Sequence, residues 1–133
     1  LPLVSIDIDQ IKQVFIGIIN NAIDSMSTGG RLEIVVAKKD GFVEIAFSDS
    51  GAGMTKEQLS HIFQPLYSTK SEKGTGLGLA LAQSIIRQHR GNILIDSAPG
   101  YGTTVTIKLP TVADEDIFAD LGNNINFANN SSA

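Results

Sequence analysis

Apolar residues in the first part of the chain recur at intervals of three and four, which is the spacing of one buried helix face. The members of this run are Ile11, Val14, Phe15, Ile18, Ala22 and Met26. Asp7 stands before the run and Gln10 follows three residues later, which predicts a carboxylate N-cap answered by a side-chain amide. Ser27–Gly30 predicts the helix end, and the short apolar run Leu3–Ile6 predicts an edge strand ahead of the helix.

Two pairs of alternating segments predict β-hairpins. In the first pair, side chains alternate over residues 32–37 and apolar residues recur over 43–47, and Asp40-Gly41 between them is typical of a tight turn. In the second pair, strands over 93–97 and 103–109 flank a turn that contains proline and glycine. Most strand pairing in this chain should therefore be antiparallel.

Two further helices lie between the hairpins. Thr55 with Gln58 predicts a capping box that starts a helix ending near Ile62. Another helix follows the glycine run that begins at Lys73, and Gly91 closes it. Helices that stand outside hairpins imply a two-layer α/β sandwich.

Composition limits the class of protein. The chain has 133 residues, 42% of them hydrophobic, which suffices for one domain with a single core. The absence of cysteine excludes a disulfide framework and a thiolate metal site, and it fits a reducing compartment. No signal peptide opens the chain, and no apolar stretch approaches the roughly 20 residues of a membrane span.

The charge is unevenly distributed. Residues 111–133 contain four acids and no base, so the remaining ten acids balance the ten Lys and Arg of residues 1–110. The four acids are Asp114, Glu115, Asp116 and Asp120. We therefore expect a neutral domain over 1–110 that does not bind nucleic acid, followed by an acidic, Asn-rich and weakly ordered tail over 111–133.

The run KGTGLGLALAQSII, from Lys73 to Ile86, allows two interpretations. Glycines let a ligand approach the backbone, and a helix N-terminus presents unpaired N–H groups to phosphate. A glycine-rich turn before a capped helix explains the same residues. The run alone does not separate the two.

Asn21 is the first candidate ligand on the predicted helices. It falls at the border of the apolar stripe of the first helix, which Gly17 and Asp24 share. One amide oxygen, with waters and phosphate oxygens, is a sufficient set of ligands for Mg²⁺. The alternative is a solvent-facing amide, which is the interpretation we adopt for Asn20.

Two loops add further candidates. The motif DSGAGM begins with Asp49 at a strand end, where a carboxylate can accept from an exocyclic amine while Gly51 and Gly53 admit a flat ring. An ordinary Asp-Ser-Gly turn is the alternative. In FQPLYSTK, Lys70 could carry a positive charge to a terminal phosphate, or it could belong to a plain basic loop.

Several common motifs are missing from the sequence. Neither the P-loop pattern GxxxxGK[ST] nor a dinucleotide-binding glycine fingerprint after a strand occurs. His61 and His89 have no metal-ligand partner at suitable spacing, and His89 is placed to serve the C-terminus of its helix.

Five ordered blocks resemble one family: QVFIGIINNAIDSM, DSGAGM, IFQPLYSTK, GTGLGLALAQSII and GYGTTVTIKLP. Over about residues 5–110, the chain resembles the catalytic ATP-binding domain of two-component sensor histidine kinases, of the GHKL superfamily. The resemblance implies the Bergerat fold, an α+β two-layer sandwich. Its mixed, mostly antiparallel sheet of about five strands is backed by three helices on one face.

The resemblance also implies the roles of individual residues. Asn21 would hold the Mg²⁺ that bridges the ATP phosphates, with Asp24 facing the same site, and Asn21 and Lys70 would serve catalysis. Asp49 would bind the adenine amino group, flanked by Gly51 and Gly53. The remaining implied ligands are Gly74, Thr75, Gly76, Leu77, Gly78 and Leu79 for phosphate, and Thr103 for adenine through water.

The chain differs from the family pattern at Gly17, and it lacks a phosphoacceptor histidine in a helix hairpin. The family commonly has asparagine where this chain has Gly17, and its ATP-hydrolysing members have a glutamate base there. Glycine cannot activate water, which weighs against an ATPase. Neither His61 nor His89 lies in a helix hairpin of the kind that carries the phosphoacceptor histidine.

We therefore expect a monomeric, cytoplasmic catalytic domain that binds ATP·Mg²⁺ and needs a separate dimerisation domain. The parent would be a soluble or membrane-bound sensor that signals to a response regulator, and this domain itself would not contact the membrane. Two alternatives stay open, a serine kinase of the anti-sigma type and a nucleotide-dependent interaction module.

Overall fold

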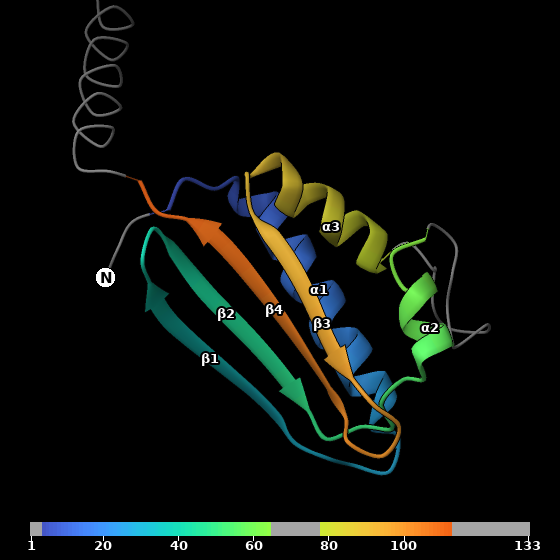
Figure 1. Ribbon diagram of the computed structural model, residues 1–133. Helices are drawn as coiled ribbons and strands as arrows, with labels where there is room; N and C mark the ends of the chain where they lie inside the picture. Colours follow the sequence, from blue (N-terminus) through green and yellow to red (C-terminus); the bar gives the residue numbers. More distant parts are fainter. Residues whose placement is uncertain (1–3, 65–77, 113–133) are drawn as a thin grey trace, which may run out of the picture.

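The computed structural model describes residues 4–64 and 78–112. Three helices and four strands follow one another in the order expected from the sequence (Figure 1). The elements are α1 (Ile8–Ser25), β1 (Leu32–Lys39), β2 (Phe42–Asp49), α2 (Lys56–His61), α3 (Gly78–Gln88), β3 (Asn92–Ser97) and β4 (Thr103–Pro110).

The strands form one sheet with the order β1-β2-β4-β3, and every neighbouring pair is antiparallel. Asp40 and Gly41 make a two-residue turn between Lys39 and Phe42, as predicted. The register places Asp49 opposite Thr103 at one end of the β2–β4 ladder and Phe42 opposite Pro110 at the other.

The α+β class is confirmed, but two details of the expected sheet are wrong in the described part of the chain. It has four strands rather than about five, and no parallel pair. The edge strand expected over Leu3–Ile6 does not form over residues 4–6, the described part of that run. Val4 packs against the hydrophobic core instead, three residues before the N-cap Asp7 of α1.

α1 and α3 lie side by side over one face of the sheet (Figure 1). α2 is short, has no buried residue and lies at the edge of this helical layer. Two of the three helices therefore back the sheet, and α2 begins with the capping box expected of Thr55 and Gln58.

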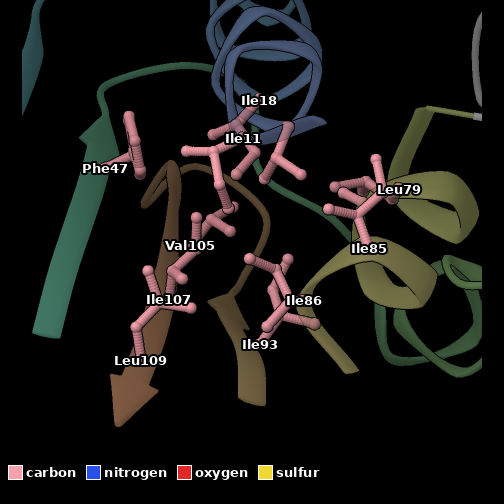
Figure 2. Packing of buried hydrophobic residues seen from close by; sticks show 12 residues of the cluster. Ile11, Ile18, Phe47, Leu79, Ile85, Ile86, Ile93, Val105, Ile107 and Leu109 are labelled. Carbon is pink, nitrogen blue, oxygen red and sulfur yellow. The ribbon is translucent and has the colours of Figure 1, made fainter. Parts of the chain in front are cut away.

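The core lies between the two long helices and the central strands (Figure 2). Ile18, Ile86, Ile107 and Val14 are its fully buried large side chains. They come from α1, α3 and β4, whose apolar positions recur at the helical and strand periods predicted above. Phe15 adds an edge-on ring contact with Phe47 of β2, with 5.4 Å between the ring centroids.

The N-terminus of α1 is capped differently from the expected box. The Asp7 carboxylate accepts from the Gln10 N–H at 3.1 Å, as predicted. The Asp7 N–H, however, donates to His89 Nε2 at 2.9 Å and not to the Gln10 side chain. The other ring nitrogen, His89 Nδ1, donates to the Ile85 carbonyl at 2.8 Å, so His89 does serve the end of α3 and also ties it to α1.

Candidate nucleotide-binding site

The predicted carboxylate Asp49 lies half-buried at the end of β2, against the C-terminal end of α1. Its Oδ1 atom accepts from the Gly51 N–H at 2.9 Å and from the Ser25 hydroxyl at 3.4 Å. Among residues 4–64 and 78–112, no donor reaches Oδ2. Asp49 is therefore held by one oxygen and can accept a ligand N–H with the other.

The backbone around Asp49 approaches other segments so closely that only glycine fits. A Cβ on Gly51 would collide with Ser25, and a Cβ on Gly53 would collide with the Ala98 carbonyl. Gly102, just before β4, would collide with the Asp49 carbonyl in the same way. Gly53 and Gly102 also have φ of 73° and 76°, a region that side chains other than glycine rarely adopt. These contacts bring residues 49–53, α1 and the β3–β4 loop together.

A hydroxyl network completes this end of the sheet. Ser97 Oγ accepts from the Met54 N–H at 2.8 Å, donates to the Gly102 carbonyl at 2.9 Å and lies 2.8 Å from Thr103 Oγ1. Thr103, a predicted adenine contact, is directly opposite Asp49 in the register. Both side chains therefore point to the same face of the sheet, the one that α1 covers.

Asn21 and Asp24 lie exposed on the last turns of α1. Asn21 is one helical turn before Ser25, whose hydroxyl contacts Asp49, so Asn21 lies on the side of α1 next to the strand end. Gly17 is one turn further back and half-buried. The structure thus brings together the amide, the carboxylate and the glycines that the sequence singled out separately.

Other predicted ligands fall outside the described residues. These are Lys70, Gly74, Thr75, Gly76 and Leu77. Gly78 is the first residue of α3. Leu79 has a buried side chain in the core cluster, so any phosphate contact it makes would use its backbone.

Sequence reasoning missed three residues of this site. Ser25 and Ser97 support Asp49 and the surrounding loops through hydroxyl contacts, and neither lies in a motif whose spacing predicts such a partner. Gly102 could have been found, because the pattern Gly-Tyr-Gly before a strand is typical of a turn with positive φ.

Among residues 4–64 and 78–112, no group of three or more His, Asp or Glu side chains is placed to hold a metal ion. A site formed by one amide oxygen and ligand phosphates does not require such a group. No helix in this same part of the chain is both long and apolar enough to cross a bilayer.

Comparison with known proteins decides the family. The model of the histidine kinase-, DNA gyrase B-, and HSP90-like ATPases matches residues 6–113. The chain belongs to this ATPase family. The predicted resemblance to the ATP-binding catalytic domains of sensor histidine kinases is thereby confirmed, and with it the Bergerat fold.

The relatives that this chain resembles include a sensor histidine kinase and a sporulation kinase. The sensor histidine kinase ZraS of Klebsiella oxytoca is 46% identical over 105 residues, which are 78% of this chain and 22% of that protein. Sporulation kinase C of Bacillus subtilis (strain 168) is 44% identical over 108 residues, 81% of this chain and 25% of that protein. The chain thus spans about a quarter or less of these relatives.

A solved structure supports the same grouping. The catalytic domain of histidine kinase ThkA superposes with a TM-score of 0.71 at 31% identity, covering 80% of this chain and 70% of that one.

Proposed function

We propose that this chain is the catalytic module of a sensor histidine kinase, which binds ATP·Mg²⁺ and transfers the γ-phosphate to a histidine on a separate dimerisation domain. The observation that carries the proposal is the Asp49 carboxylate, which is fixed at the end of β2 through Oδ1 by Gly51 and Ser25, with Asn21 one helical turn before Ser25 on α1. Membership of the ATPase family supports ATP as the ligand.

Asp49 binds the adenine amino group through Oδ2, since Oδ1 is already engaged by Ser25 and Gly51. A carboxylate that accepts from an amine distinguishes adenine from guanine, whose carbonyl at that position offers no proton. Gly51 and Gly53 keep the backbone flat beside the ring, and Thr103 stands opposite Asp49 to hold a bridging water.

Asn21 supplies the protein oxygen for Mg²⁺, and Asp24 lies on the same stretch of α1. The metal, when bound, neutralises charge on the transferring phosphate. Lys70 and the backbone of residues 74–79 hold the phosphates in this proposal. Because Gly17 offers no amide and no base, metal coordination has one group fewer than is usual and water is not activated.

The phosphoacceptor belongs to another domain, in keeping with the greater length of the relatives. We place the module in the cytoplasm, as a monomer in isolation, with a response regulator downstream in the parent's pathway. Transfer depends on positioning the two domains, so the isolated chain should bind ATP with little turnover.

The first experiment tests adenine recognition by comparing Asp49→Asn with Asp96→Asn. Asp96 is exposed on the opposite face of the sheet and offers the same loss of charge. Loss of a hydrogen bond to a charged group should weaken ATP binding by roughly 10- to 100-fold in calorimetry. Asp96→Asn should leave the affinity unchanged. Equal affinities for the two variants would refute the role of Asp49.

The second experiment tests the metal by comparing Asn21→Ala with Asn20→Ala. Both residues are exposed neighbours on α1, so their effects on the helix should match. Only Asn21→Ala should abolish the gain in ATP affinity that Mg²⁺ provides. If both variants keep that gain, Asn21 is not the metal ligand.

The third experiment tests the reaction. The chain is incubated with radiolabelled ATP and the dimerisation domains of ZraS and sporulation kinase C, and the products are treated with acid. A phosphohistidine is lost in acid, whereas a phosphoserine survives. An acid-stable product would favour the serine-kinase alternative.

A further inference from the structure

An open pocket lies at the end of the sheet opposite Asp49. It has a volume of ≈ 410 Å³, and Arg90 and Lys108 line it beside Phe42, Asn92 and Pro110. Phe42 and Pro110 are paired at this end of the β2–β4 ladder, and Asp49 and Thr103 are paired at the other end. At about 3.3 Å per residue, roughly 23 Å separate the two ends.

Two cations, Arg90 and Lys108, line the pocket. Within residues 4–64 and 78–112, neither Arg90 nor Lys108 forms a salt bridge. Lys108 Nζ lies 5.1 Å from the centroid of the Phe42 ring. Glu44 is opposite Lys108 in the register, but its carboxylate lies 3.8 Å from Lys39 Nζ. Two cations thus face one pocket beside an aromatic ring.

The backbone of Arg90 indicates that its side chain is needed there. Arg90 follows α3 with φ of 62°, and it is the one non-glycine residue of the described chain with positive φ. The Arg90 N–H donates to the Arg87 carbonyl at 2.9 Å and the Gly91 N–H to the Ile86 carbonyl at 2.8 Å, an arrangement whose left-handed residue is usually glycine. A strained residue that glycine would replace without cost points to a functional side chain.

The acidic tail leaves the domain beside this pocket. The Thr111 N–H donates to the Gly41 carbonyl at 3.0 Å, and both Gly41 and Pro110 line the pocket. Asp114, Glu115 and Asp116 follow Thr111 within five residues. At about 3.3–3.6 Å per residue, these carboxylates can reach the pocket when the chain turns back over it.

We propose that the acidic segment 114–116 docks into this pocket, with its carboxylates on Arg90 and Lys108. The tail is then an intramolecular ligand of the far end of the sheet. This inference does not depend on the proposed kinase function, because docking there leaves the Asp49 end open and should not change ATP affinity.

The test uses the full chain with one nitroxide label. The sequence has no cysteine, so Ala119→Cys gives a unique attachment site in the tail. Paramagnetic broadening is then measured on the backbone amides of Gly91 and Asn92. Docking should reduce these two signals at least by half relative to the reduced label, and raising the salt from about 0.15 M to about 0.5 M should restore part of the intensity.

Three variants separate docking from simple proximity of the tail. In the tail variant, Asp114→Asn, Glu115→Gln and Asp116→Asn are combined, and no described residue changes. In the pocket variant, Arg90→Asn is combined with Lys108→Gln, since asparagine tolerates the left-handed backbone. Lys56→Gln on α2 is the control for loss of a distant cation.

The tail variant and the pocket variant should each recover at least half of the lost intensity, and their combination should recover no more than either alone. Lys56→Gln should recover none. Unchanged broadening in the tail variant overturns the proposal, as does additive recovery, because independent effects mean that the two groups do not meet. Sulfate that shifts the Gly91 and Asn92 amides without releasing the tail also overturns it, since the pocket then takes a free anion instead.

Discussion

The two ends of the β2–β4 ladder differ in the side chains that surround them. At the Asp49 end, hydroxyls and crowded glycines surround one carboxylate, and Gly53 and Gly102 contact backbone carbonyls of other segments. At the far end, charged and aromatic side chains line a pocket; a Cβ on Gly41 would meet nothing within 4 Å, whereas a Cβ on Gly91 would collide with the Lys108 carbonyl. Backbone segments approach closely at both ends, so the ends differ in their chemistry: a carboxylate among hydroxyls at the first, and two cations beside an aromatic ring at the second.

This difference predicts where substitutions are tolerated. Close packing fixes an acceptor within a narrow range of positions, so a change there should affect both folding and ATP binding. Changes at the far end should affect stability or docking of the tail, and they should leave ATP binding unchanged.

The largest expected effect is at Gly102. Gly102→Ala adds a Cβ that collides with the Asp49 carbonyl and forces alanine to a positive φ, which together should lower the free energy of unfolding by about 3 kcal/mol. Gly100→Ala is the matched control, since Gly100 has φ of 82° and open space around it. It should cost only about 1 kcal/mol in urea unfolding. Equal losses would show that crowding at this end is unimportant.

Ser97→Ala should have the next largest effect. It removes a hydroxyl that contacts Met54, Gly102 and Thr103, and it leaves half-buried polar groups unpaired, at about 2 kcal/mol. Ser48→Ala is the control, because its hydroxyl contacts Thr104 alone among the described residues. Chemical denaturation should show a smaller loss for Ser48→Ala, and calorimetry should show weaker ATP binding only for Ser97→Ala.

His89→Ala tests the far end. It removes the contacts to the Asp7 N–H and the Ile85 carbonyl and should lower the free energy of unfolding by about 1 kcal/mol, because water can replace part of both contacts. The Asp7 amide should exchange faster with deuterium, which NMR can follow. Gln88→Ala, an exposed neighbour, should leave that rate unchanged. A loss of ATP affinity in His89→Ala would contradict the independence of the two ends.

The smallest effect, and a favourable one, is expected at Gly17. Glycine within a helix is less favourable than alanine by about 1 kcal/mol, so Gly17→Ala should raise the unfolding temperature. Gly17→Asn should stabilise less, but it places an amide one turn from Asn21. Under the proposed function, only Gly17→Asn should increase the affinity for ATP·Mg²⁺. Equal affinities for the two variants would show that position 17 does not reach the metal.

The sequence by itself determined the local features of this protein. The caps at Asp7 and Thr55, the Asp40-Gly41 turn and the strands and helices depend on side-chain period and on bonds within a few residues. The same holds for the motif that carries Asp49, Gly51 and Gly53. The ordered blocks also sufficed to identify the ATPase family.

Only the tertiary structure decided the long-range partners. In the folded chain, the Asp7 N–H donates to His89 and not to Gln10, and residues 4–6 lie outside the sheet. Ser25, Ser97 and Gly102 come together near Asp49. The tertiary structure also placed Arg90 and Lys108 in one pocket beside the start of the acidic tail. The physical reason is that a hydrogen bond or a steric contact acts over about 3 Å, and segments far apart in the sequence come that close only when the whole fold is assembled.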